Sequence, residues 1–215
     1  MTIVGVSGSP IVGGNTDRII KAVLEQSGKD HLFINLSTLR YDSCRACAHL
    51  CASTGICPLD DDLKPYFEPI RDAEALVLGT AIHAGYMTGW MFSFTTRLSC
   101  FSHVKLPLRD KPVVLVVTGC FEESEKTVPQ FARNVTVQSR GARVIGHIFY
   151  ASSRPPCSRS SIAHVCKVGG LWYMLGRSEE KLRDFKLTRD MFKRWEDCPE
   201  TVTEVARYAQ MLSEL

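Results

Sequence analysis

The sequence Val4-Gly-Val-Ser-Gly-Ser-Pro-Ile-Val-Gly-Gly-Asn-Thr16 decides the fold. It joins a β-branched run, residues 2–6, to a segment whose apolar residues recur at helical spacing, namely Ile19, Ile20, Val23 and Leu24. This pattern predicts a strand, a long turn and a helix. No lysine or arginine lies between Ser7 and Thr16, so an anion bound there must be held by backbone N–H groups, hydroxyls and the positive end of the helix.

The hydroxyl-rich turn is suited to a single terminal phosphate. It lacks the Gly-Lys-Ser/Thr of a P-loop and the spaced glycines of a dinucleotide fingerprint. We expect a flavin mononucleotide (FMN) phosphate to bind at Ser7, Ser9, Gly14, Asn15 and Thr16, with Asn15 or Thr16 capping the helix. The alternative is an ordinary turn that uses Gly and Ser as turn residues.

Composition limits the class of protein. The 215 residues fit one large α/β domain, and the net charge of +3 from 26 basic and 23 acidic residues favours neither nucleic acid nor an anionic membrane as a partner. No apolar run approaches the ~20 residues that span a bilayer, and the chain opens on a predicted strand, so we expect a cytoplasmic protein. In a reducing compartment its nine cysteines predict metal ligands, reactive thiols or core residues rather than disulfides.

Strand and helix patterns alternate along the chain. Strands are predicted at 2–6, 31–36, 75–79, 113–118 and 143–150, and helices at 63–70, 88–99 and 123–140, the first of these shortened or kinked by Pro69. The predicted fold is therefore a flavodoxin-like, doubly wound α/β sheet of five parallel strands in the order 2-1-3-4-5, with helices on both faces. Ligands of such sheets lie beyond the carboxyl ends of strands 1 and 3.

Two parts of the chain are predicted to differ in role. Residues 1–150 are expected to form the FMN-binding domain, including a Cys-rich loop at 41–60. Residues 151–215 are expected to form a C-terminal extension packed on the same domain, with helices at 178–195 and 199–215. Its Pro/Ser-rich start, 151–177, is interpreted as a lid or dimer arm, or as an ordinary surface extension.

The phosphate loop and the segment 80–97 resemble the signatures of the flavodoxin-like NADPH-dependent FMN reductases and iron-sulfur flavoproteins. In the second signature, Ala81, His83, Phe92 and Thr96 replace the family's Pro, Tyr, Lys and Asp. The resemblance implies that Ala81, Ile82, His83 and Ala84 lie along the flavin ring, with Gly119 and Cys120 at a third contact. It also implies a nicotinamide donor, NAD(P)H, or another redox carrier, and a homodimer or homotetramer that the run 90–92 could serve.

Four cysteines, Cys44, Cys47, Cys51 and Cys57, lie within one short segment. Closely spaced thiolates suit a 4Fe-4S cluster or a zinc ion, and unliganded thiols are the third alternative. The segment resembles the compact motif that iron-sulfur flavoproteins carry in this connection, with a middle spacing one residue longer. Cys100, Cys157, Cys166 and Cys198 are too widely spread in sequence to predict a second motif and are interpreted as packing residues.

The leading hypothesis is an FMN-dependent oxidoreductase of the iron-sulfur flavoprotein type, which passes electrons between a carrier, the cluster and the flavin. The flavin performs the chemistry, so no catalytic acid or base is assigned. An NAD(P)H-dependent FMN or quinone reductase without a cluster is the second hypothesis, with Arg154 and Arg159 as candidates to meet the extra phosphate of NADPH. A non-catalytic, zinc-bearing flavodoxin-like binding protein is the third.

Overall fold

A computed structural model describes residues 2–103, 105–152, 155–188, 191 and 193–215. Five parallel strands form its central sheet: β1 (Thr2–Ser7), β2 (Asp30–Asn35), β3 (Ala75–His83), β5 (Pro112–Gly119) and β6 (Arg143–Ala151). Their spatial order, β2-β1-β3-β5-β6, confirms the predicted order 2-1-3-4-5. A short sixth strand, β4 (Tyr86–Met87), was not predicted and pairs antiparallel with the end of β3.

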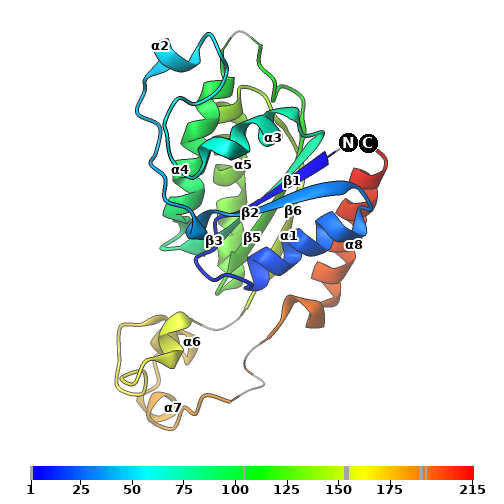
Figure 1. The fold of residues 1–215 in the computed structure, drawn as a ribbon. Coiled ribbons are helices and arrows are strands. Elements are labelled where there is room, and N and C mark those ends of the chain that lie inside the picture. Colours follow the sequence, from blue (N-terminus) through cyan, green and yellow to red (C-terminus); the bar gives the residue numbers. More distant parts are fainter. Residues whose placement is uncertain (1, 104, 153–154, 189–190, 192) are drawn as a thin grey trace.

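Helices cover both faces of the sheet (Figure 1). On one face lie α1 (Asn15–Gln26) and α8 (Pro199–Ser213), which share a core with Ile148 and Tyr150 of β6. On the other face α3 (Phe67–Asp72), α4 (Gly89–Arg97) and α5 (Val128–Ser139) form a second core. The central strands are apolar throughout because both of their faces are buried. Ligand access is therefore left to the ends of the strands, where the loops lie.

Shorter elements fill the connections. The α-helical ones are α2 (Ala48–Cys51), α6 (Gly170–Met174) and α7 (Glu179–Arg183). The 3₁₀ turns are η1 (Leu36–Thr38), η2 (Lys64–Tyr66), η3 (Leu98–Phe101), η4 (Glu122–Thr127), η5 (Pro156–Arg159) and η7 (Trp195–Asp197).

Three predicted helices are shorter than expected. The helix predicted at 123–140 is α-helical only from Val128, after the 3₁₀ turn η4. The helix predicted at 63–70 is α-helical only from Phe67, because Pro65 lies in the 3₁₀ turn η2 that precedes it. The helix predicted at 178–195 is wrong beyond its first turns: Ser178 caps α7, which ends at Arg183. Of the residues that the structure describes around α7, only Ala163, Leu171 and Leu182 are buried together, so a longer helix would have little apolar surface to pack on.

The extension after β6 has two parts. Helix α8 packs on the α1 face of the sheet, whereas residues 155–188, which we name the arm, have their own small core and project beyond the carboxyl ends of the strands (Figure 1). Among the residues that the structure describes, none of the helices combines the length and apolarity that crossing a bilayer requires.

Candidate functional site

A cleft opens at the carboxyl edge of the sheet, between the loops that follow β1, β3, β5 and β6. Nine of the eleven residues predicted to bind the cofactor line it, together with six that were not predicted: Ser9, Gly14, Asn15, Thr16, Ala81, Ile82, His83, Gly119 and Cys120, with Pro10, Ile11, Thr118, Tyr150, Ser152 and Pro156. The other two predicted residues lie outside it. Ser7 is fully buried beneath the loop, and Ala84 lies in an exposed turn with φ of 49°.

Helix α1 begins at the cleft without a side-chain cap. Its N-cap residue is Gly14, not Asn15 or Thr16 as predicted. The hydroxyl of Thr16 lies instead 2.7 Å from that of Thr118, and the first N–H bonded within the helix is that of Arg18, 3.0 Å from the carbonyl of Gly14. The N–H groups of the first turn are thus left to a ligand, at the positive end of the helix dipole.

A buried carboxylate, not predicted from the sequence, holds the loop in shape. Asp17, 1% exposed, accepts hydrogen bonds from the Ser7 hydroxyl (2.5 Å), the Gly13 N–H (2.8 Å) and the Asn35 amide (2.8 Å). Asp17 shares one helical stripe with Ile20 and Leu24, three and seven residues on, and an acid on an apolar stripe is a signal that a sequence reader can use. Ser7 therefore supports the loop rather than the ligand.

The C-terminal extension clamps the same loop. Arg18 donates from Nε and Nη2 to the two carboxylate oxygens of Glu196, at 2.9 and 3.1 Å, and from Nη2 to Oδ1 of Asn15 at 2.6 Å. Although partial burial opposes its charge, N–H donors from Arg18 and Arg194 lower the pKa of Glu196 to about 2. No local pattern predicts a partner 178 residues away.

Tyr150 presents an unsatisfied polar atom next to the cleft. The side chain is 4% exposed, and its Oη is buried without a hydrogen-bond partner among the described residues. Burial raises the pKa of Tyr150 to about 12, so the phenol is a neutral donor at ordinary pH. Because buried polar groups are nearly always paired, this orphaned donor, the uncapped helix and the backbone of three loops fit a phosphorylated ligand.

The four predicted metal ligands line one cavity of about 460 Å³, together with Cys100 and His103. Cys44 is exposed, whereas Cys51 and Cys57 are buried. Burial and the neighbouring thiols of Cys47 and Cys57 raise the pKa of Cys51. The chemistry of these donors suits a soft metal, but within the described ranges no three Cys, His, Asp or Glu side chains stand close enough to hold an ion.

Arg97 ties the cysteine loop to α4. Its buried guanidinium donates to Sγ of Cys57 (3.0 Å), to Oδ2 of Asp61 (2.6 Å) and to the carbonyl of Asp42 (2.9 Å). Burial opposes its charge, but Asp61 and Cys57 raise the pKa of Arg97 overall. Asp61 is thus chiefly the partner of a buried cation.

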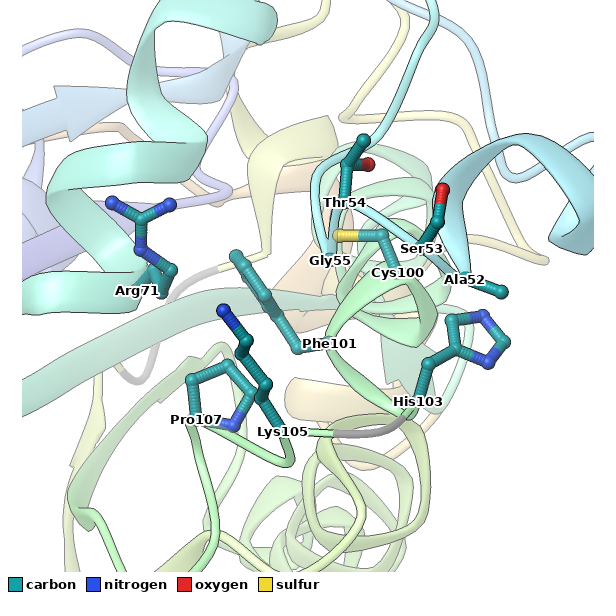
Figure 2. Close-up of a pocket in the computed structure, with 10 residues that line it drawn as sticks. All are labelled: Ala52, Ser53, Thr54, Gly55, Arg71, Cys100, Phe101, His103, Lys105 and Pro107. Carbon is teal, nitrogen blue, oxygen red and sulfur yellow. The ribbon is translucent and has the colours of Figure 1, made fainter.

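A neighbouring cavity of about 270 Å³ shares Cys100 and His103 with the cysteine cavity (Figure 2). Arg71, Lys105 and His103 surround it, but the Arg71 guanidinium is already paired with Asp72 at 2.7 and 2.8 Å. It contains none of the predicted cofactor residues. It therefore belongs to the surroundings of the cysteine loop and not to the cleft.

Three further predictions concern the cleft's surroundings. In the run 90–92, Trp90 and Phe92 are exposed, but Met91 is fully buried and is unavailable to a partner. Arg159 is the last residue of η5, whose first residue, Pro156, lines the cleft. Arg154 lies outside the described residues.

The order of the strands defines a flavodoxin-like protein, in which an uncapped helix opens on a cleft at the carboxyl ends of the strands. The sequence profile of the NADPH-dependent FMN reductase family matches residues 1–155, and the chain belongs to that family.

Individual relatives agree with this class. The chain is 30% identical over 88 residues to an iron-sulfur flavoprotein of Methanocaldococcus jannaschii (40% of this chain, 45% of the relative). It is 32% identical over 88 residues to an iron-sulfur flavoprotein of Methanosarcina thermophila (40% and 46%). These matches span less than half the length of either relative. The fold is similar to that of an apo NADH:FMN oxidoreductase, with a TM-score of 0.58 and 15% identity over 99% of this chain and 88% of that one.

Proposed function

We propose that this protein is an FMN-dependent oxidoreductase that receives electrons from NAD(P)H or another reduced carrier. The observation that carries the proposal is the uncapped start of α1, whose N–H groups face a cleft between the loops after β1, β3 and β5. When bound there, FMN supplies one- and two-electron redox chemistry. Membership of the FMN reductase family supports the same cofactor.

The chain's own residues would bind and orient the cofactor. The first-turn N–H groups at Asn15 and Thr16 would hold the phosphate, and the backbone of Ala81, Ile82 and His83 would lie along the ring. The antiparallel pairing of His83 with Tyr86 stiffens that segment, which Ala84 terminates. A Cβ on Gly119 would meet Ser124 Cβ at 2.3 Å, so only glycine lets the third loop fold this tightly beside Cys120.

Binding and reduction test this function in one preparation of the full chain. We expect FMN to bind more tightly than riboflavin by about tenfold or more, since riboflavin lacks the phosphate that the helix N-terminus favours. Anaerobic addition of NADH or NADPH should then bleach the flavin absorbance. Equal affinity for the two flavins would refute the phosphate site. Tight FMN binding with no reduction by either nucleotide would leave a flavin-binding protein that uses another donor.

We further propose that Cys44, Cys47, Cys51 and Cys57 hold a 4Fe-4S cluster after the loop closes around it. Three observations support this. The four cysteines line one cavity, the Arg97 guanidinium donates to Sγ of Cys57, and two relatives are iron-sulfur flavoproteins. Zinc and unliganded thiols are the alternatives. Iron, zinc and sulfide analysis of an anaerobic preparation distinguishes the three, with Cys47→Ser expected to lose the metal and Cys198→Ser to retain it. Flavin without iron or sulfide would favour the cluster-free NAD(P)H-dependent FMN or quinone reductase, and zinc without flavin the binding protein.

The remaining sequence predictions belong to the same proposal. We assign flavin binding to residues 1–150 and a supporting role to the extension 151–215. We expect a cytoplasmic homodimer or homotetramer, which cell fractionation and light scattering would test.

A further inference from the structure

Two cysteines that are unrelated in the sequence converge in the arm. A Cβ placed on Gly169 would lie 3.3 Å from Sγ of Cys157 and 3.3 Å from Sγ of Cys166. The two sulfurs are therefore no farther apart than twice that distance, and no side chain of Gly169 stands between them. Both thiols are partly exposed, so both are accessible to small reagents.

Short turns produce this convergence. The N–H of Ser160 bonds to the carbonyl of Cys157, that of Ala163 to Ser160, and that of Cys166 to Ile162, at 3.0, 3.0 and 3.1 Å. These bonds fold the nine-residue step from Cys157 to Cys166 back on itself. The interpretation of both cysteines as separate packing residues is thus incomplete.

The arm has few other means of stabilisation. Its fully buried core is limited to Ala163, Leu171 and Leu182, against which four partly buried residues pack: Cys157, Trp172, Leu175 and Phe185. A segment of this size rarely buries enough apolar surface to be stable alone, and natural proteins add disulfides or metals in such cases. In the described part of the chain no third Cys, His, Asp or Glu joins the pair to form a metal site, which leaves a covalent link between the two sulfurs as the remaining staple.

We propose that Cys157 and Cys166 form a reversible disulfide by exchange with small-molecule disulfides of the oxidised glutathione class. One thiolate attacks the small disulfide, which forms a mixed disulfide and releases one small thiol. The other cysteine then attacks the protein sulfur of the mixed disulfide and releases the second small thiol. The two cysteines lose two electrons and two protons, and the two released thiols gain them.

The link would fix the arm at the mouth of the cleft. Cys157 directly follows Pro156, which lines the cleft. After Cys166 in the chain, Gly170 packs against Pro155. A Cβ placed on Gly170 would lie 2.8 Å from Cβ of Pro155 and 3.5 Å from Cζ of Phe121. The disulfide would therefore join two segments of the arm, one at Pro156 and one at Gly170, that both reach the loops of the cleft.

Peptide mapping of the intact protein tests the proposal directly. The protein is equilibrated anaerobically at a series of oxidised-to-reduced glutathione ratios, free thiols are alkylated, and the products are digested with trypsin. Cleavage after Arg159 places Cys157 and Cys166 in different peptides, so only a disulfide can hold them together. We expect the linked pair to rise with the ratio and to return to free peptides on reduction. Absence of the pair at every ratio, or dominant pairing of either cysteine with a third, would overturn the proposal.

Three variants sharpen the test. Cys157→Ser should abolish the linked pair, whereas Cys198→Ser, which changes a cysteine outside the arm, should leave it unchanged. Gly169→Ala keeps both thiols but inserts a methyl group between them, and its φ of −83° is accessible to alanine. We expect Gly169→Ala to lower the yield of the pair about tenfold because disulfide geometry is narrow. An undiminished yield would contradict the placement of the sulfurs around Gly169.

Discussion

Replacement of Asp17 tests whether a buried carboxylate organises the phosphate loop. Asp17→Ala removes the acceptor of three hydrogen bonds, of 2.5, 2.8 and 2.8 Å. Hydrogen bonds to a charged group contribute about 1.5–3 kcal/mol each, although the buried charge itself is costly and the Ser7 hydroxyl can rotate to another acceptor. We therefore expect the free energy of unfolding to fall by about 3–4 kcal/mol. Asp17→Asn keeps an oxygen for Gly13 and Asn35 and should lower it by about 1–2 kcal/mol.

Urea unfolding of the apoprotein, followed by circular dichroism, measures these differences, and each kcal/mol should lower Tm by about 2–4 °C. Asp72→Ala, which removes an exposed carboxylate paired with Arg71, is the matched control and should change little. Flavin fluorescence titration of the two Asp17 variants should show a larger loss of affinity for FMN than for riboflavin, since only FMN carries the phosphate that the loop would bind. The reasoning is refuted if Asp17→Ala is as stable as Asp72→Ala, or if both flavins lose affinity equally.

Three further substitutions probe other contacts. Tyr150→Phe removes a buried hydroxyl without a partner among the described residues and should raise the free energy of unfolding of the apoprotein by about 1 kcal/mol. Tyr208→Phe removes the acceptor of the His147 N–H and should lower it by about as much. A change of Tm in the same direction in both variants would contradict this. The pKa of Glu196 is lowered from the ordinary value of 4.5 to about 2, so its ion pair is fully stabilising above pH 4.5 and is lost as pH falls through 2. The difference in unfolding free energy between wild type and Glu196→Gln should therefore narrow across that range of pH, and a constant difference in acid urea titrations would refute the pairing. Arg97→Met should cost about 3–5 kcal/mol by stranding the Asp61 carboxylate, and adding Asp61→Asn should restore part of it; a double variant no more stable than the single one would exclude that cause.

The sheet could be predicted because its determinants are local. Each central strand is a short apolar run bounded by turn residues, and five such strands that alternate with helices favour the flavodoxin-like order. The cleft followed for the same reason, since loops after neighbouring strands meet at one edge. The sequence therefore predicts that Gly14 and Gly119, far apart in the chain, meet at this edge, and both line the cleft.

The supporting contacts could not be predicted because their partners are distant or their geometry is irregular. Asp17 depends on Asn35, 18 residues on, and Arg18 on Glu196. The convergence of Cys157 and Cys166 arises from successive turns, for which no periodic pattern exists. The helix predicted beyond Arg183 failed because propensity alone does not sustain a helix without a surface to pack on.

The clamp between Arg18 and Glu196 has a consequence for biosynthesis. The loop that it braces leaves the ribosome well before Glu196, which lies 178 residues farther along the chain than Arg18. A nascent chain can thus assemble much of its sheet before this brace of the phosphate loop exists. We therefore expect tight binding of FMN only after Glu196 has been translated and has paired with Arg18.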